Sequence, residues 1–174
     1  MSFMSRLTLF TFSAFLTFCL TIPSLHSLRN RAFTPSPAAA PPTPQAEIQA
    51  FNKQFIAAHL RMDMPAILSF WADDGISLLP ETPPIEGKPA IRKFVEDAIA
   101  QMPGYRVTLM EIEFRNIQVS GDWASEWGLE HQVAEGPADK PKFDGHGKIL
   151  LILHKDSSGT WKVQQEMWNS APKP

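Results

Sequence analysis

The spacing of apolar residues changes from a helical to a strand period near Gly104, and this change limits the chain to a few folds. Before it, apolar residues recur every three or four positions over 46–62 and 90–101, which predicts two amphipathic helices. After it, apolar and polar residues alternate, interrupted by turn sequences such as 120–122, which predicts four strands. Helices followed by a run of strands are typical of the α+β class, with helices on one face of an antiparallel sheet.

The segment between the two long helices predicts shorter elements. Pro65 suits the first turn of a short helix over 66–70. The residues 71–75 predict a turn whose two aspartates bond the backbone, and we expect a short strand over 76–79 to follow. The phase of the apolar residues within the first long strand shifts near Glu111, which predicts a bulge there.

The chain begins with an uncharged segment over 7–22 that is rich in Leu and Phe and follows Arg6. This order is typical of a secretory signal peptide, which we expect at 1–27, so the protein is predicted to be exported, periplasmic or secreted. An uncleaved membrane anchor is the alternative, although the segment is shorter than the about 20 residues of a spanning helix. The Pro-rich residues 28–45 predict a tether, which leaves one folded domain at 46–174.

The charged and metal-binding residues exclude several classes of protein. The predicted domain holds all eighteen Asp and Glu residues but thirteen of the sixteen Lys and Arg residues, so it is acidic and we expect no nucleic-acid partner. The single cysteine, Cys19, lies in the predicted signal peptide. There is no HxH, HxxxH or HExxH pattern, and His146 and His154 are too far apart on one extended strand to share an ion. The sequence therefore predicts no metal and no cofactor.

Several local patterns, in this order, resemble the SnoaL-like branch of the nuclear transport factor 2-like superfamily. They are ILSFWADDG at 67–75, IEGKPAIRKFV at 85–95, VSGDWA at 119–124 and GHGKILLILHKDSSGTWKVQQEMWNS at 145–170. The resemblance covers essentially the whole predicted domain and implies a cone, in which a curved antiparallel sheet wraps around the long first helix and leaves a pocket. This fold hosts isomerases, cyclases, dehydratases and non-catalytic modules, so it implies no single activity.

The resemblance also implies which side chains line the pocket. They are Phe55, His59, Trp127, His131, Glu166 and Trp168. We interpret Glu166 and His131 as an acid/base pair, because an apolar pocket raises the pKa of a carboxyl and histidine titrates near neutral pH. The other four would bind a small apolar or aromatic molecule. Solvated positions for Glu166 and His131, and a role at the helix end for His59, are the alternatives.

The resemblance does not extend to the catalytic residues of ketosteroid isomerase, a member of the same superfamily. The positions that match its base, its tyrosine and its second aspartate are Leu79, Phe55 and about Leu151, all apolar. The first hypothesis is therefore a ligand-binding domain with acid/base activity of isomerase or cyclase type. The second is a non-catalytic homodimer that meets its partner through the outer sheet face, with Leu150 and Ile152 at the centre.

Overall fold

Helix α1 (Pro44–Leu60) begins at a proline and carries the side chains that fill the centre of the fold. A computed structural model describes residues 41–173, so the predicted signal peptide and most of the predicted tether lie outside the described residues. The Thr43 hydroxyl caps α1 by accepting a hydrogen bond from the Ala46 backbone N–H, and Pro44 has no N–H to satisfy. The helix thus begins two residues before the predicted domain boundary.

One face of α1 is buried against the sheet, and its spacing of three and four residues follows from the helical period. The buried residues are Ile48, Phe51, Asn52, Phe55 and Ala58. Asn52 is the one polar member of this stripe, and it is only 6 % exposed. Within the part of the chain that the structure describes, no helix is long and apolar enough to cross a membrane.

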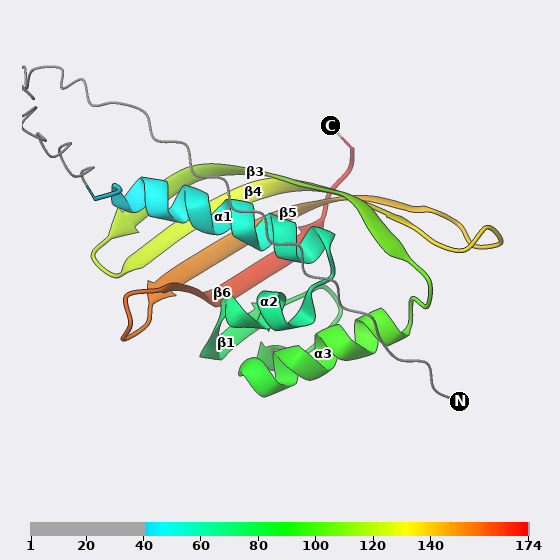
Figure 1. The fold of residues 1–174 in the computed structure, drawn as a ribbon, viewed down its shortest axis with the longest axis horizontal. Helices are drawn as coiled ribbons and strands as arrows, with labels where there is room; N and C mark the ends of the chain where they lie inside the picture. Colours follow the sequence, from blue (N-terminus) through cyan, green and yellow to red (C-terminus); the bar gives the residue numbers. More distant parts are fainter. Residues whose placement is uncertain (1–40, 174) are drawn as a thin grey trace, which may run out of the picture. The chain divides into compact units, whose positions relative to one another are not determined.

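Two further helices lie close to the first strand. Helix α2 (Met64–Ser69) is capped by Asp63, whose carboxylate accepts a hydrogen bond from the Ala66 N–H at 3.2 Å. Helix α3 (Lys88–Ala100) follows Gly87, whose φ of 82° lies in the left-handed region that favours glycine. Figure 1 shows α3 beside β1 and α1 lying along the sheet next to β3.

Six strands form a single curved sheet in the order β2-β1-β6-β5-β4-β3. They are β1 (Trp71–Leu78), β2 (Ile85–Glu86), β3 (Arg106–Ser120), β4 (Trp123–Glu135), β5 (Phe143–Lys155) and β6 (Trp161–Ser170). The predicted α+β class with a curved sheet is confirmed. Neighbouring strands are antiparallel except β1 and β6, which pair in parallel. The long stretch of chain between these two strands meets the need of a parallel pair for a connection longer than a hairpin.

The predicted turn at 71–75 is wrong, since these residues begin strand β1. The two aspartates bond side chains rather than their own backbone. Lys88 Nζ lies 2.7 Å from Asp73 Oδ1, and Gln164 Nε2 donates to Asp74 Oδ1 at 3.1 Å. The pairing of β1 with β6 shifts between Trp71 and Ile76, so this part of the strand does not show the simple alternation from which strands are predicted.

Register irregularities in the sheet decide which side chains face inward. In β3 the register shifts between Val107 and Leu109 and again between Arg115 and Gln118, so the bulge predicted near Glu111 is displaced. In β6 the shift lies between Val163 and Gln165. A bulge adds one residue to one strand and reverses the alternation beyond it. Gln164 is the extra residue in β6, so Val163 and Gln165 lie on opposite faces of the sheet although they are two residues apart.

Strand β5 shows the two faces of the sheet most clearly. Ile149, Leu151 and Leu153 are buried and pack with α1, and we call their side of the sheet the inner face. The alternating residues Leu150 and Ile152 lie on the opposite side, the outer face, as the sequence predicts. The core therefore lies between the inner face and α1.

Candidate functional site

A cavity of about 150 Å³ is bounded by the end of α1, by α2 and α3, and by β1 and β6. Three polar side chains line it, those of His59, Ser77 and Glu166, and we call it the Glu166 cavity. Its other walls are apolar and include Ile67 and Ile91. A dry cavity of this volume accommodates a molecule about as large as benzene.

Glu166 lies on the inner face of β6, where it pairs with Ser77 of β1 on one side and with Leu151 of β5 on the other. Burial is the main cause that raises the pKa of Glu166, and the negative charge of Glu130 raises it further. A hydrogen bond from Ser77 opposes these effects, and the resulting pKa is about 7. The carboxyl can therefore both donate and accept a proton near neutral pH.

His59 reaches the same cavity from the last turn of α1. Its Nδ1 donates a hydrogen bond to the Phe55 carbonyl oxygen at 2.8 Å. Burial lowers the pKa of His59, and the bond to Phe55 only partly opposes this. A neutral imidazole with its proton on Nδ1 keeps a lone pair on Nε2, so His59 can accept a hydrogen bond or a proton from a molecule in the cavity.

Two more glutamates lie on the inner face, both on β4. Glu126 is 1 % exposed, and burial raises its pKa to about 7 although Asn52 donates a hydrogen bond to it. Burial likewise raises the pKa of Glu130, opposed by a hydrogen bond from Trp168. Glu126 and Glu166 both pair with Leu151, so they lie in one row across the sheet on either side of β5.

The predicted positions of Trp127 and His131 in the pocket are wrong. The inner face of β4 carries Glu126 and Glu130, so residues that alternate with them point outward. Trp127 is 39 % exposed, and His131 bonds Asp144 on the outer face. The sheet therefore separates His131 from Glu166, and the two cannot act as an acid/base pair.

Phe55 and Trp168 are inside the domain but do not line the Glu166 cavity. Phe55 packs in an aromatic cluster, with its ring centroid 4.2 Å from that of His59. Trp168 lies on the inner face against Gly147, where a Cβ would collide with the indole. It borders a different hollow, which it shares with Glu130. Phe55 thus supports His59, whereas Trp168 supports Glu130.

Sequence reasoning missed Asn52, Ser77, Glu126 and Glu130, and three of them had a detectable signal. Asn52 interrupts an otherwise apolar helical stripe, which is where a buried polar partner is expected. On β4, the inner glutamates alternate with the small residues Ala124 and Gly128, and Gly128 leaves room for side chains from β3 and β5. Ser77 carries no comparable signal.

The comparisons with known proteins agree with this fold. The family model of the SnoaL-like domain matches residues 52–147, which is more than half of the chain. The chain therefore belongs to the SnoaL-like domain family, whose fold is shared by cyclases, dehydratases and isomerases. No curated protein matches the chain.

Solved structures from several bacteria have a similar fold. A ketosteroid isomerase-like protein from Erwinia carotovora atroseptica has a TM-score of 0.64 at 22 % identity, over 74 % of this chain and 96 % of that one. ActVI-ORFA from Streptomyces coelicolor has a TM-score of 0.62 at 12 % identity, over 72 % and 96 %. An NTF2-like protein of unknown function from Pseudomonas putida has a TM-score of 0.57 at 23 % identity, over 74 % and 86 %. At such identities the likeness shows the fold alone.

Proposed function

We propose that the domain binds a small, mostly apolar molecule in the Glu166 cavity and transfers a proton on it. The observation that carries this proposal is that Glu166, with a pKa of about 7, and a neutral His59 line one apolar cavity. A carboxyl that is half protonated near pH 7 can act as acid or base, and the imidazole provides a second proton acceptor. This pair replaces the predicted pair of Glu166 and His131.

The size and lining of the cavity restrict the ligand. About 150 Å³ holds one six-membered ring, and the three polar groups would fix the position of a single carbonyl or hydroxyl on it. Isomerisation, cyclisation and dehydration of such a molecule require protons to be removed and added at neighbouring atoms. These are also the reaction types known for members of this fold.

Ligand binding can be tested with phenol and cyclohexanone, each a single ring with one oxygen, titrated into the protein in a calorimeter. We expect saturable binding to the unmodified protein and its loss in Val95→Trp, because Val95 lines the cavity and the larger side chain would fill it. Leu150→Trp is the matched control on the outer face and should bind as before. Equal binding by both variants would place the ligand elsewhere.

Proton transfer can be tested separately by incubating cyclohexanone with the protein in D₂O and following loss of the hydrogens next to the carbonyl by NMR. We expect exchange to be faster than in buffer and to fall to the buffer rate in Glu166→Gln, which keeps the shape of the side chain but cannot take up the proton. Glu135→Gln, exposed on β4, is the control. Unchanged exchange in Glu166→Gln would remove this residue from the reaction.

An apolar row on the outer face supports the second candidate function, a homodimeric interaction module. Trp127, Leu150 and Met167 lie directly beside one another on β4, β5 and β6. They are 39 %, 39 % and 42 % exposed, so a contiguous apolar strip crosses the sheet where a second copy could pack in a two-fold arrangement.

Light scattering at increasing protein concentration tests the dimer. We expect twice the monomer mass for the unmodified protein and the monomer mass for Leu150→Lys, which places a charge at the centre of the strip. Lys148→Leu changes a neighbouring exposed residue of the same strand without adding a charge to the strip, and it should leave the dimer intact. A monomer at every concentration would rule out this candidate.

A further inference from the structure

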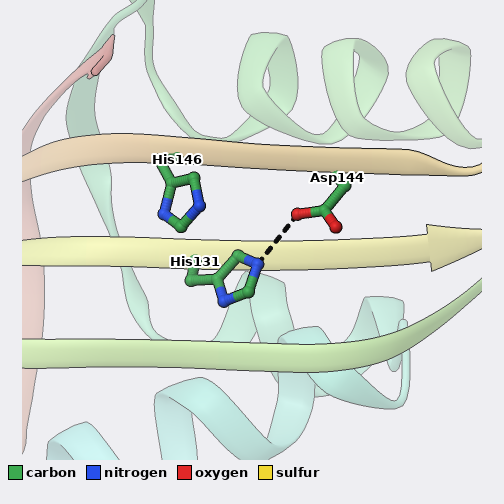
Figure 2. A group of neighbouring side chains, drawn as sticks. All are labelled: His131, Asp144 and His146. Atoms are coloured by element: carbon green, nitrogen blue, oxygen red, sulfur yellow. Dashed lines mark hydrogen bonds and ion pairs between the residues drawn. The ribbon is translucent and has the colours of Figure 1, made fainter. Parts of the chain in front are cut away.

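A second cluster of chemically active side chains lies on the outer face, on the opposite side of the sheet from the Glu166 cavity. It consists of His131 on β4 and Asp144 and His146 on β5, which we call the outer His cluster. His131 pairs directly with His146 across the two strands. Asp144 is two residues before His146 and therefore shares its face. Figure 2 shows the three side chains projecting from these neighbouring strands toward one another.

The atoms of the outer His cluster that could bind an ion already converge. His131 Nε2 donates a hydrogen bond to Asp144 Oδ1 at 2.9 Å. The rings of His131 and His146 are stacked, with centroids 4.2 Å apart and an angle of 14° between their planes. One ligand atom from each of the three residues lies within 4.8 Å of the others.

These spacings are close to those of a bound transition metal. Zn²⁺ holds nitrogen and oxygen ligands at about 2.0–2.2 Å in a tetrahedron, so its ligand atoms lie about 3.3 Å apart. Rotation of the two imidazoles and the carboxylate about their side-chain bonds can close the remaining distance. Both strands are paired along this stretch, so their backbones hold the three residues in place before an ion arrives.

The surroundings add negative charge and space for an ion. His131 and His146 line a groove of about 220 Å³ together with the acidic side chains Glu111 and Glu113 of β3. Glu111 pairs directly with His131, which places it in the same row across the sheet as the two histidines. Two positive charges oppose the cluster: Lys142 Nζ lies 3.9 Å from Asp144 Oδ2, and Lys173 also acts on the charge of Asp144.

We propose that His131, Asp144 and His146 form a binding site for a divalent transition metal ion, with Zn²⁺ as the expected ion. Two neutral imidazoles and one carboxylate are a ligand set that suits Zn²⁺, and three protein ligands leave a fourth position for water or for another molecule in the groove. Binding would replace the proton on His131 Nε2 that now bonds Asp144. The metal-binding patterns of single sequence segments, such as HxH and HExxH, do not contain this site, because its ligands come from two strands.

The site can be tested by calorimetric titration of ZnCl₂ into the purified full-length protein after treatment with EDTA and desalting. We expect one Zn²⁺ per chain, with affinity at least about tenfold weaker in His131→Ala, in His146→Ala and in Asp144→Asn. His154→Ala is the matched control, because His154 is on the same strand but stacks on Trp123 with ring centroids 4.1 Å apart. Its affinity should equal that of the unmodified protein.

A second readout keeps the test independent of folding defects in the variants. CoCl₂ added to the unmodified protein should give the visible absorption of four-coordinate Co²⁺, and one equivalent of Zn²⁺ should abolish it. Glu166→Gln should leave both signals unchanged, so failure of the proposed function would not affect this result. The proposal is overturned if the unmodified protein binds no Zn²⁺ saturably, or if His131→Ala and His146→Ala bind it as tightly as His154→Ala.

Discussion

Asn52 of α1 donates a hydrogen bond from Nδ2 to Glu126 Oε2 of β4 at 2.8 Å, and both side chains are buried. The amide oxygen of Asn52, Oδ1, and the second carboxylate oxygen of Glu126, Oε1, have no hydrogen-bond partner. An ionised carboxylate cannot satisfy the amide oxygen, because both groups are acceptors. A protonated Glu126 provides a donor, which agrees with its pKa of about 7. Burial therefore favours the neutral form of Glu126, although the bond from Asn52 Nδ2 by itself favours the ionised form.

The first prediction concerns the pH dependence of stability. The pKa of Glu126 is about 7 in the folded protein and 4.5 when unperturbed, so the folded state binds the proton more tightly. The resulting stabilisation is complete when the pH is below 4.5, the pKa in the unfolded chain, and it is lost as the pH rises through the folded pKa of about 7. Between about pH 5.5 and about pH 8, we expect the unmodified protein to lose about 2 kcal/mol more of its free energy of unfolding than Glu126→Gln loses.

Urea unfolding at the two pH values measures this difference. The glutamine amide can accept from Asn52 Nδ2 and donate to Asn52 Oδ1, so the variant should stay folded. Glu135→Gln, an exposed change on the same strand, should show the pH dependence of the unmodified protein. A Glu126→Gln variant that loses stability with rising pH as steeply as the control would show that Glu126 is ionised in the fold.

The second prediction concerns the two neighbours that set the pKa of Glu166. The charge of Glu130 raises this pKa and the hydrogen bond from Ser77 lowers it. We therefore expect Glu130→Gln to move the titration midpoint of Glu166 to lower pH and Ser77→Ala to move it to higher pH. The ¹³C shift of the Glu166 carboxyl, followed by NMR, reports both midpoints. Shifts of the same sign in the two variants would contradict this assignment of causes.

The third prediction concerns the packing of Trp168. Gly147 pairs with Ser170 beside it, and a Cβ at Gly147 would collide with the indole. We expect Gly147→Ala to lower the free energy of unfolding by about 1–3 kcal/mol, because the indole must leave its position. Ser170→Ala, at the exposed end of the same row, should change it by less than about 0.5 kcal/mol. A Gly147→Ala protein as stable as Ser170→Ala would show that the indole does not need this space.

The fourth prediction concerns export, which we propose from the uncharged segment at 7–22. Mass spectrometry of the protein isolated from its own cells should find a chain that lacks residues 1–27 and is recovered outside the cytoplasm. Recovery of the intact chain in the membrane fraction would instead support an uncleaved anchor. Replacement of Leu16 by Arg interrupts the segment and should retain the protein inside the cell, whereas Leu16→Ile should not.

The order of the elements could be predicted from the sequence, because a helical period and a strand period are visible without knowledge of the fold. Which side chains of each strand point to the inner face could not be predicted from the sequence. On β4 the alternation gives two faces, and the apolar Trp127 suggests the wrong one, since buried glutamates are rare. On β6 the bulge between Val163 and Gln165 places residues on faces that continuous alternation does not give. The resemblance to a known fold predicts Glu166 and His59 in one pocket, and both line the Glu166 cavity. The contact between Glu126 and Asn52 could be found only once the register of the strands was known.

The pairing of strands also explains why the sequence does not predict the outer His cluster. His131 and Asp144 are thirteen residues apart in sequence and meet because β4 and β5 form a hairpin of this register. A loop of uncertain length between the strands leaves that register open, and a shift by one residue would move His131 to the other face. The contact is therefore a property of the tertiary structure rather than of a local motif.

The pKa of Glu166 tests the account of the cavity most directly. NMR titration of the ¹³C-labelled carboxyl groups, with the Glu166 signal assigned by its loss in Glu166→Gln, measures this value in the folded protein. We predict a midpoint near 7, because burial and the charge of Glu130 outweigh the bond from Ser77. A midpoint near 4.5, the value of an unperturbed glutamate, would contradict the proposal that Glu166 exchanges protons with a molecule in the cavity.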